Sequence, residues 1–462
     1  MIARKHSMDL KGIFCRKVYQ PLLHRRRGLN VRLWEERFRN FEAMTPEALV
    51  SHQQDALLIM LRYAYLHVPY YRCLLESGGI RAIDDHVPDI SHNIPILTKD
   101  IDRDQEFQLR SRDPELQQVH QNMTGGSTGT PLNFCQDADY RAAALGAERC
   151  ILRWWGIEPG DRTTAFWGAD RELHDWTLRE KFMMWLNREN IFDSFAMSEE
   201  KMHSFATELM RWKPLYIKGY ASSLHLFARF LLNHKQFSIR PLAIRSTAET
   251  LFDFQRNDIE SAFNCKVFNF YGSREVNNLA AECVEQSGLH ILAGSRILEV
   301  VDANDNPVPS GQVGRLIVTD LVNRAMPFIR YENGDLGVLS DTPCACGLPY
   351  PRIDKVIGRV SDVLVGKNGQ YVHGEFVTHL FYGSRGIDNF QLIQHDVNRI
   401  EIIIQGVPDN ACPDMALIKQ KICDRLGTVD ITVRYVDGFA RNSSGKHRFI
   451  ISKISPFQNT TH

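Results

Sequence analysis

Short segments of β-forming residues alternate with helical segments through the middle of this chain of 462 residues. Before about Asn190, short apolar stretches already alternate with helical ones. Further on, apolar and β-branched residues recur in short stretches that we interpret as strands: Leu215–Lys218, Ile244–Ser246, Lys266–Phe270, Ile297–Val301 and Arg315–Val318. Such alternation is typical of a sheet covered by helices. The sequence therefore predicts an α/β fold.

The pattern changes near Gly358, where we place a domain boundary. After it, three segments are typical of strands and one of a helix: Val363–Val365, Arg399–Ile404, Asp430–Tyr435 and, for the helix, Asp414–Leu426. A chain of this length also exceeds what one hydrophobic core supports. We therefore expect a large N-terminal domain of packed sheets and helices over residues 1–357. A small α+β domain follows over residues 358–462.

Charge and hydropathy exclude several classes of protein. Lys+Arg and Asp+Glu both number 55, so no global field favours nucleic acid as a partner. The best apolar run, Ala56–Leu61, is far shorter than the ~20 residues that span a bilayer. The ten cysteines are scattered, which favours reduced thiols. We expect a cytoplasmic protein without a transmembrane segment.

Basic residues crowd the first thirty positions. They are Arg4, Lys5, Lys11, Arg16, Lys17, Arg25, Arg26 and Arg27. No continuous apolar stretch follows the first charges, as a signal peptide would require. Two interpretations stay open: a basic amphipathic segment that meets a membrane surface, or a solvated helix face.

A glycine-rich segment, Thr124 to Pro131, is the most informative stretch for function. Its glycines and hydroxyls are Thr124, Gly125, Gly126, Ser127, Thr128, Gly129 and Thr130. Glycines let backbone N–H groups approach an anion closely, so this segment suits a phosphate group. No lysine follows Gly129, which argues against a Walker loop. The alternative is a flexible surface turn.

Further motifs follow in a fixed order. They are Thr247 to Leu251, Asn269 to Glu275, Asn333 to Gly337, Gly358 to Asp362 and Arg441 to Lys446. With the glycine-rich segment, this series resembles the adenylate-forming superfamily of acyl-CoA synthetases, peptide adenylation domains and luciferases. Within it the chain is most similar to the phenylacetate-CoA ligase group and its relatives from capsular polysaccharide clusters. Three further segments support the resemblance: Val68 to Arg72, Ile94 to Lys99 and Gly445 to Ile450.

The resemblance implies a role for each matching residue in the binding of ATP and Mg²⁺. The triphosphate would be held by Gly125, Gly126, Ser127, Thr128, Gly129 and Thr130. Ala248 and Glu249 would border the adenine, Tyr271 of the Tyr271-Gly272-Ser273 segment would stack on it, and Asp335 with Arg359 would bind the ribose. Glu275 would bind Mg²⁺, a hard ion that prefers carboxylate oxygens. The alternatives are a core aromatic for Tyr271 and a turn without a ligand for Asp335.

The resemblance further implies that Lys446, Thr128 and Glu275 are catalytic, with Lys446 as the cation. A lysine on the mobile small domain reaches the bridging oxygens as pyrophosphate leaves. Otherwise Gly445-Lys446 is a solvated turn. Two positions depart from the family pattern: Arg274 stands where threonine is usual, and Ser361 stands where the hinge usually has a charged residue.

The resemblance further implies that the acid pocket is lined by Trp167, Gly168, Tyr220, Ser222 and Asn269. It does not identify the carboxylic acid. We expect activation of the acid as an acyl-adenylate and transfer to coenzyme A. Alternatives are transfer to a carrier-protein thiol, an amine or another acceptor, or a nucleotide-binding scaffold without catalysis. Whether the chain forms a homodimer is left open.

A second group of residues suggests structural zinc. Cys344 and Cys346 form a Cys-x-Cys-Gly turn, and Cys283 and His290 flank a Ser287-Gly288 turn. Four such ligands suit a tetrahedral Zn²⁺ site, and the Cys-x-Cys-Gly segment resembles metal-binding members of the group. The alternative is a set of reduced core cysteines.

Overall fold

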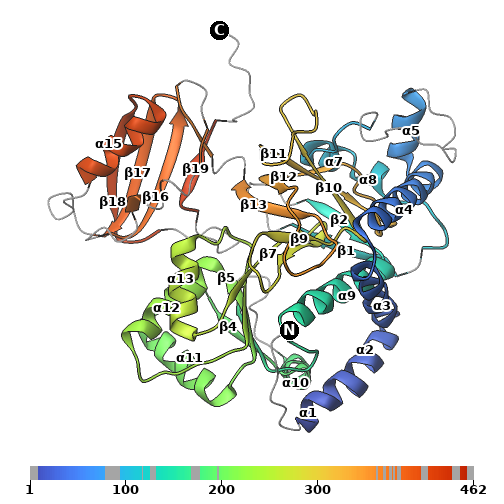
Figure 1. The fold of residues 1–462 in the computed structure, drawn as a ribbon, viewed down its shortest axis with the longest axis horizontal. Helices are drawn as coiled ribbons and strands as arrows, with labels where there is room; N and C mark the ends of the chain where they lie inside the picture. Colours follow the sequence, from blue (N-terminus) through green and yellow to red (C-terminus); the bar gives the residue numbers. More distant parts are fainter. Residues whose placement is uncertain are drawn as a thin grey trace. The chain divides into compact units, whose positions relative to one another are not determined.

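The computed structural model is shown in Figure 1. It describes residues 9–78, 94–116, 118–124, 132–167, 177–194, 197–359, 363–367, 371–373, 377, 380–381, 387–406, 415–439 and 448–454. The chain divides into two compact units, Met1–Asn333 with Gly337–Val356 and Gly334–Leu336 with Ile357–His462. Among the described helices, none combines the length and apolar character that crossing a lipid bilayer requires.

A large mixed sheet is the centre of the first unit. Among the described residues it has eleven strands, in the order β10 (Arg296–Val301), β11 (Val313–Asp320), β12 (Tyr331–Ser340), β13 (Arg352–Arg359), β9 (Leu289–Ile291), β8 (Asn277–Glu282), β7 (Val267–Ser273), β6 (Ala243–Thr247), β5 (Tyr216–Tyr220), β3 (Thr163–Trp167) and β4 (Glu189–Asp193). From β4 to β7 neighbouring strands are parallel, and β8 pairs antiparallel with both β7 and β9. The α/β fold class is thereby confirmed.

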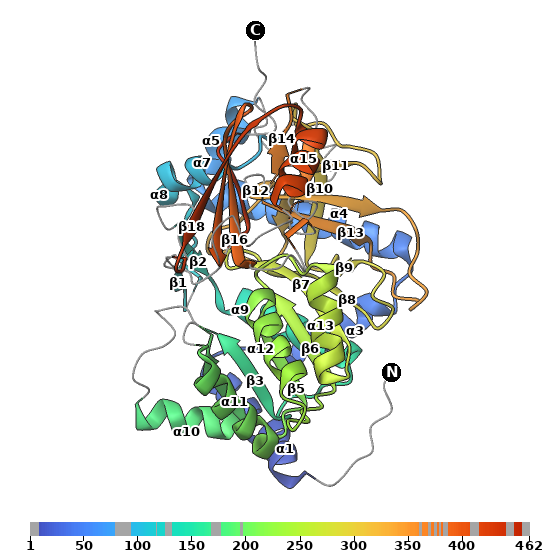
Figure 2. The same cartoon turned by 90° about the vertical axis from the view of Figure 1, so that its left-hand side faces the viewer.

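Helices cover both faces of the parallel strands (Figure 2). Successive residues of a strand point to opposite faces. Tyr216 therefore packs with helix α9 (Ala138–Trp154) in one core cluster. Its neighbour Ile217 packs with α12 (Ala221–Asn233) and α13 (Asp253–Phe263) in another, beside α11 (Glu199–Trp212). Two apolar cores thus fix the parallel strands between helical layers.

The N-terminal part is helical. Its elements are α1 (Leu10–Phe14), the π-helical turn η1 (Cys15–Tyr19), α2 (Gln20–Arg26), α3 (Val31–Glu42), α4 (Pro46–His67), α5 (Pro69–Ser77), α7 (Lys99–Asp104) and α8 (Glu106–Leu109). Helix α3 packs on α9. After α8 comes an antiparallel hairpin, β1 (His120–Met123) and β2 (Asn133–Gln136). Helix α10 (Leu178–Asn187) lies between β3 and β4 in the sequence.

The second unit has its own sheet and core. Four strands lie in the order β18 (Asp430–Val436), β17 (Arg399–Gly406), β16 (Ile387–Asp396) and β19 (Ile450–Ser452). Strand β14 (Val363–Val365) pairs with β15 (Tyr371–His373). Helix α15 (Met415–Leu426) buries Ile418 and Ile422 in the same cluster as Ile402.

Candidate active site

The predicted pocket residues lie at the carboxyl ends of neighbouring strands of the sheet. Trp167 ends β3, Tyr220 ends β5, Thr247 ends β6 and Ser273 ends β7. These four strands are parallel, and Tyr220 pairs directly with Thr247. Their carboxyl ends therefore open on the same side, which is where ligands bind in open α/β sheets. The fold thus brings together motifs that lie about a hundred residues apart in the sequence.

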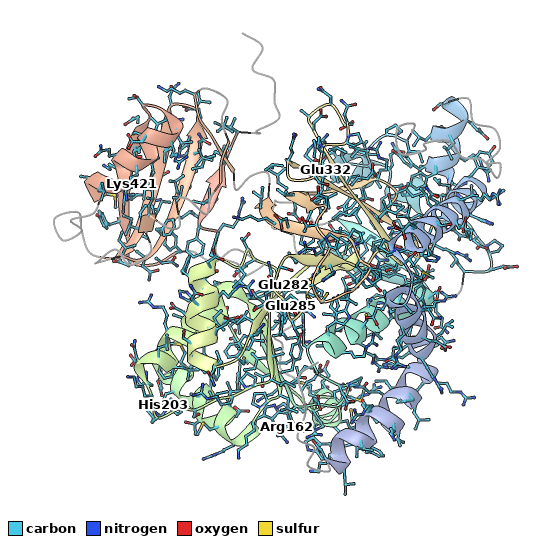
Figure 3. The ribbon with its side chains drawn as sticks, viewed as in Figure 1. Arg162, His203, Glu282, Glu285, Glu332 and Lys421 are labelled. Carbon is cyan, nitrogen blue, oxygen red and sulfur yellow. The ribbon has the colours of Figure 1, made fainter. Side chains whose placement is uncertain are left out.

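The acid-pocket candidates Trp167 and Tyr220 are in direct contact. Their rings stack with centroids 4.8 Å apart and an interplanar angle of 28°. Asn269 of β7 is half-buried, and its backbone N–H donates to Glu282 over 2.7 Å. Glu282, labelled in Figure 3, is itself held by Arg256 at 2.8 Å. Gly168 lies outside the described residues.

Glu249 joins the nucleotide motif to the acid-pocket motif. Its carboxylate accepts two hydrogen bonds from Ser222, from the backbone N–H at 2.8 Å and from the hydroxyl at 3.0 Å. Ser222 lies in the first turn of α12, so a negative charge there is favoured by the unpaired N–H groups and the helix dipole. The preceding residue, Ala248, has a left-handed φ of 68° that turns the chain at the end of β6. Glu249 therefore has a structural role that its sequence motif did not reveal.

Tyr271 and Gly272 form the end of β7, at an irregularity in its pairing with β8. A side chain at Gly272 would place its Cβ 2.2 Å from the backbone oxygen of Asn277, so only glycine fits. The Tyr271 side chain is 8% exposed and accepts a hydrogen bond from Asn333 at 2.5 Å. Most of its surface is therefore already covered by protein, and its stacking on adenine stays a prediction.

The Glu275 carboxylate is also buried, at 5% exposure. The Tyr331 hydroxyl donates to its Oε1 over 3.0 Å, and the Tyr140 hydroxyl donates to its backbone oxygen over 3.0 Å. These contacts fix a hard anionic ligand of the kind that Mg²⁺ prefers. The sequence analysis assigned no role to Tyr331 or Asn333. The available signal was the Asn333–Gly337 motif, which begins at Asn333 and follows Tyr331 by two residues.

The glycine-rich segment joins β1 to β2. Residues 125–131, which hold the candidates Gly125, Gly126, Ser127, Thr128, Gly129 and Thr130, lie outside the described residues. The base of this connection is closed by Thr124, whose backbone N–H donates to the Leu132 carbonyl and whose Oγ1 accepts from the Leu132 N–H, each over 2.9 Å. Arg274 donates to the Met123 carbonyl over 3.4 Å, and Gln136 donates to the Arg274 carbonyl over 3.2 Å. Arg274, which departs from the family pattern, therefore joins the hairpin of β1 and β2 to the segment that carries Glu275.

Three candidates lie in or beside the second unit. Asp335 is half-buried within β12, so the Asn333–Gly337 motif lies in a strand and the alternative of a turn was wrong. Arg359 is the last residue of β13. Lys446 and Ser361 lie outside the described residues. The roles of these residues stay predictions.

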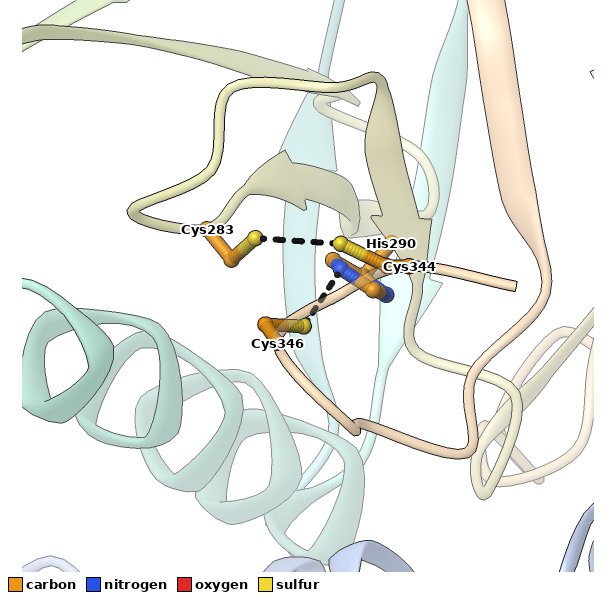
Figure 4. Close-up of side chains that lie close together, drawn as sticks. All are labelled: Cys283, His290, Cys344 and Cys346. Carbon is orange, nitrogen blue, oxygen red and sulfur yellow. Dashed lines mark hydrogen bonds between the residues drawn. The ribbon is translucent and has the colours of Figure 1, made fainter. Parts of the chain in front are cut away.

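Cys283, His290, Cys344 and Cys346 come together (Figure 4). Their ligand atoms lie within 4.8 Å of one another, with 3.7 Å between the sulfurs of Cys283 and Cys344 and 3.3 Å between Cys346 Sγ and His290 Nε2. A tetrahedral zinc ion with Zn–S bonds of about 2.3 Å holds its sulfurs about 3.8 Å apart, whereas a disulfide needs about 2.05 Å. Burial lowers the pKa of His290 to about 4, so its imidazole is neutral at neutral pH. The four residues fit a zinc ion.

Comparison with known proteins finds relatives of both units. The CapK C-terminal domain family matches residues 364–453. The chain is 26% identical over 341 residues to protein CapK of Staphylococcus aureus, covering 72% of this chain and 74% of that protein. It is 28% identical over 340 residues to a phenylacetate-coenzyme A ligase of Thermus thermophilus, covering 70% and 73%.

Solved structures show the same fold. The crystal structure of 2-hydroxyisobutyryl-CoA ligase in the postadenylation state matches with a TM-score of 0.67 and 20% identity, over 90% of this chain and 92% of that chain. The chain is thus similar over about 70% of its length to CapK and to the phenylacetate-coenzyme A ligases. It also shares the fold of an acyl-CoA ligase, and its residues 364–453 match the CapK C-terminal domain family.

Proposed function

We propose that this chain is an AMP-forming acid-thiol ligase, which activates a carboxylic acid with ATP and transfers the acyl group to coenzyme A. The carrying observation is the convergence of Trp167, Tyr220, Glu249 and Tyr271 at the carboxyl ends of adjacent parallel strands. The acid-pocket residues of β3 and β5 are neighbours there of the nucleotide residues of β6 and β7. A reaction between an acid and a nucleotide needs this adjacency.

In the first half-reaction, the carboxylate oxygen attacks the α-phosphorus of ATP and pyrophosphate leaves. We assign the triphosphate to residues 125–130 and Mg²⁺ to Glu275. When bound there, Mg²⁺ would supply positive charge to the phosphate oxygens. Lys446 stabilises the charge that grows on the bridging oxygen as pyrophosphate departs. In the second half-reaction, the thiol of coenzyme A attacks the acyl carbon and AMP leaves.

We propose that Cys283, His290, Cys344 and Cys346 hold a zinc ion with a structural role. Three cysteines and one histidine would complete a tetrahedral set of ligands and leave no open position for catalysis. The four ligands come from the turn after β8, from β9 and from the connection between β12 and β13. The ion would join the β8–β9 hairpin to the connection between β12 and β13. We place the whole protein in the cytoplasm, where ATP, coenzyme A and reduced thiols occur together.

The test is product analysis with the purified full chain. ATP, Mg²⁺ and coenzyme A are incubated with a panel of aryl, fatty and hydroxy acids, and AMP and acyl thioester are measured by mass spectrometry. We expect both products in equal amounts with at least one acid. Acid-dependent AMP without a coenzyme A thioester would reject coenzyme A in favour of another acceptor. Absence of AMP with every acid would contradict the ligase assignment.

A further inference from the structure

The outward face of the N-terminal helices carries large apolar side chains. Leu10, Phe14, Val18 and Leu22 are spaced by four residues and are 72%, 52%, 42% and 62% exposed. Side chains at this spacing lie on one face of a helix. Single exposed apolar residues are ordinary in folded proteins, but four in register form a continuous stripe.

The inner face of the same helices is held largely by polar contacts. Arg188 forms an ion pair with Asp9 at 2.7 Å, and Arg149 donates to Gln20 over 2.7 Å. Gly12 lets helix α1 lie close to the rest of the protein. A Cβ at this position would lie only 3.2 Å from the backbone oxygen of Gly160. The hydrophobic effect ordinarily places the large apolar side chains of a surface helix inward. Here they point outward, an arrangement that favours a second apolar environment outside the protein.

Helix α10 extends the apolar surface. Leu178, Phe182 and Trp185 are 88%, 56% and 58% exposed and are spaced by four and three residues. The Phe182 and Trp185 rings stack with centroids 5.8 Å apart. Lys11 connects the two stripes, because its Nζ lies 5.6 Å from the centre of the Trp185 ring. We call these seven apolar residues, on α1 to α2 and α10, the apolar patch.

Positive charge accompanies the patch. Residues 10–27 contain no Asp or Glu and six basic residues, Lys11, Arg16, Lys17, Arg25, Arg26 and Arg27. Arg16 is paired with Glu158. Helix α10 adds Arg179 and Lys181, whereas its single acidic residue, Glu180, is engaged with Thr177 in a capping box. Basic residues therefore outnumber acidic ones on the helices that carry the patch.

We propose that the apolar patch docks on an anionic lipid bilayer surface. Leu, Phe and Trp side chains insert at the boundary between headgroups and acyl chains, while Lys and Arg side chains bind the anionic headgroups. A second copy of the chain fits this surface less well. A two-fold interface would place the same basic residues opposite one another, where like charges repel.

The test measures binding of the full chain to sedimented vesicles. One set contains phosphatidylcholine alone, and the other contains equal parts of phosphatidylcholine and phosphatidylglycerol. A triple variant, Phe14→Ser with Leu22→Ser and Trp185→Ser, removes three of the seven apolar residues of the patch. Its matched control replaces three equally exposed apolar residues elsewhere, Val50→Ser with Ile59→Ser and Val313→Ser.

We expect binding to the anionic vesicles, weakened by salt because the headgroup contacts are screened. The patch variant should lose at least about tenfold in apparent affinity, because three large apolar side chains no longer leave water on binding. The control variant should bind as the original chain does. Reversing charge at Lys17→Glu with Arg25→Glu should also weaken binding, while Lys235→Glu with Lys421→Glu should not.

Three results would overturn the proposal. The first is absence of binding to anionic vesicles by a folded chain. The second is equal loss in the patch variant and its control, which would remove the specificity of the surface. The third is a dimer in sedimentation velocity that the patch variant alone abolishes, without vesicle binding, because the occupant would then be a second copy. Unchanged thermal midpoints in all variants establish that folding is intact.

Discussion

Glu275 places a carboxyl group inside the protein. It is buried, and no described Lys or Arg side chain forms an ion pair with it. Its Oε1 accepts a hydrogen bond from Tyr331, which is a neutral donor. A bound cation would add a charged partner to this carboxylate, and Mg²⁺ prefers carboxylate oxygens. This is the physical basis for assigning Mg²⁺ to Glu275.

The substitution Glu275→Gln removes the negative charge of this side chain. Glu275→Gln keeps the size of the side chain and an oxygen for Tyr331, so we expect an unchanged thermal midpoint. Turnover should fall about tenfold or more, because a preorganised electrostatic group is lost from the transition state, and the Mg²⁺ requirement should rise. The control is Glu285→Gln at an exposed position (Figure 3). Unchanged turnover and magnesium dependence would remove Glu275 from the metal site.

Gly272 allows a second prediction at the scale of one residue. Because an added Cβ would lie 2.2 Å from the Asn277 oxygen, Gly272→Ala forces the backbone of β7 and β8 apart. We expect a loss of about 1–3 kcal/mol in the free energy of unfolding, the range for overpacked sites. Gly78→Ala is the control, since its Cβ would meet the nearest atom at an ordinary 3.4 Å. Equal denaturation midpoints for the two variants would contradict the tight packing.

Elements with strong local signals could be predicted from the sequence. Thr45-Pro46-Glu47 has the residue types typical of a helix start, and Thr45 accepts from the Ala48 N–H over 3.2 Å at the start of α4. Five apolar stretches predicted β5, β6, β7, β10 and β11 to within a few residues. These strands carry runs of β-branched and aromatic residues whose burial agrees with their local preference.

Elements that depend on distant partners could not be predicted. Strand β12 contains Asn333, Gly334 and Asp335, which locally favour a turn, and it is extended because neighbouring strands pair with it. Strand β16 lacks a clear alternation of polar and apolar residues and is fixed by pairing with β17 and β19. The role of Glu249 depends on Ser222, which lies 27 residues away. No local pattern records such a contact.

A zinc ion bound by Cys283, His290, Cys344 and Cys346 would hold the β8–β9 turn against the connection between β12 and β13. We expect one zinc ion per chain by elemental analysis of protein purified without a chelator. Cys346→Ser should lose the ion and lower the thermal midpoint, since metal binding contributes to folding free energy. Cys73→Ser, at an exposed position, should do neither. A metal-free sample with an undiminished thermal midpoint would refute the site.

At the scale of the whole molecule, the chain divides into two units with separate cores. The sequence places the domain boundary at 357/358, where its pattern changes. Binding of ATP and the acid by the large domain, and supply of the catalytic lysine by the small domain, stay predictions. Lys446 belongs to the small domain in that account. If the domain swings after adenylation, the lysine serves one half-reaction and leaves the site before the thiol attacks.

Lys446→Ala separates the two half-reactions. Adenylate formation should fall by about 10²–10³-fold, which corresponds to roughly 3 kcal/mol of lost transition-state stabilisation. Thioester formation from a chemically prepared acyl-adenylate should keep nearly its original rate, because AMP is then the leaving group. An equal loss in both reactions, at an unchanged thermal midpoint, would mean that Lys446 is structural or that the domain does not swing.

The central claim is that the chain joins a carboxylic acid to AMP. Exchange of labelled pyrophosphate into ATP measures that step alone, without coenzyme A or any other acceptor. We predict exchange that requires both Mg²⁺ and one acid of the aryl, fatty and hydroxy acid panel, and that falls by about 10²–10³-fold in Lys446→Ala. A folded chain that binds ATP but exchanges no pyrophosphate with any acid of the panel would contradict the account and favour a nucleotide-binding scaffold.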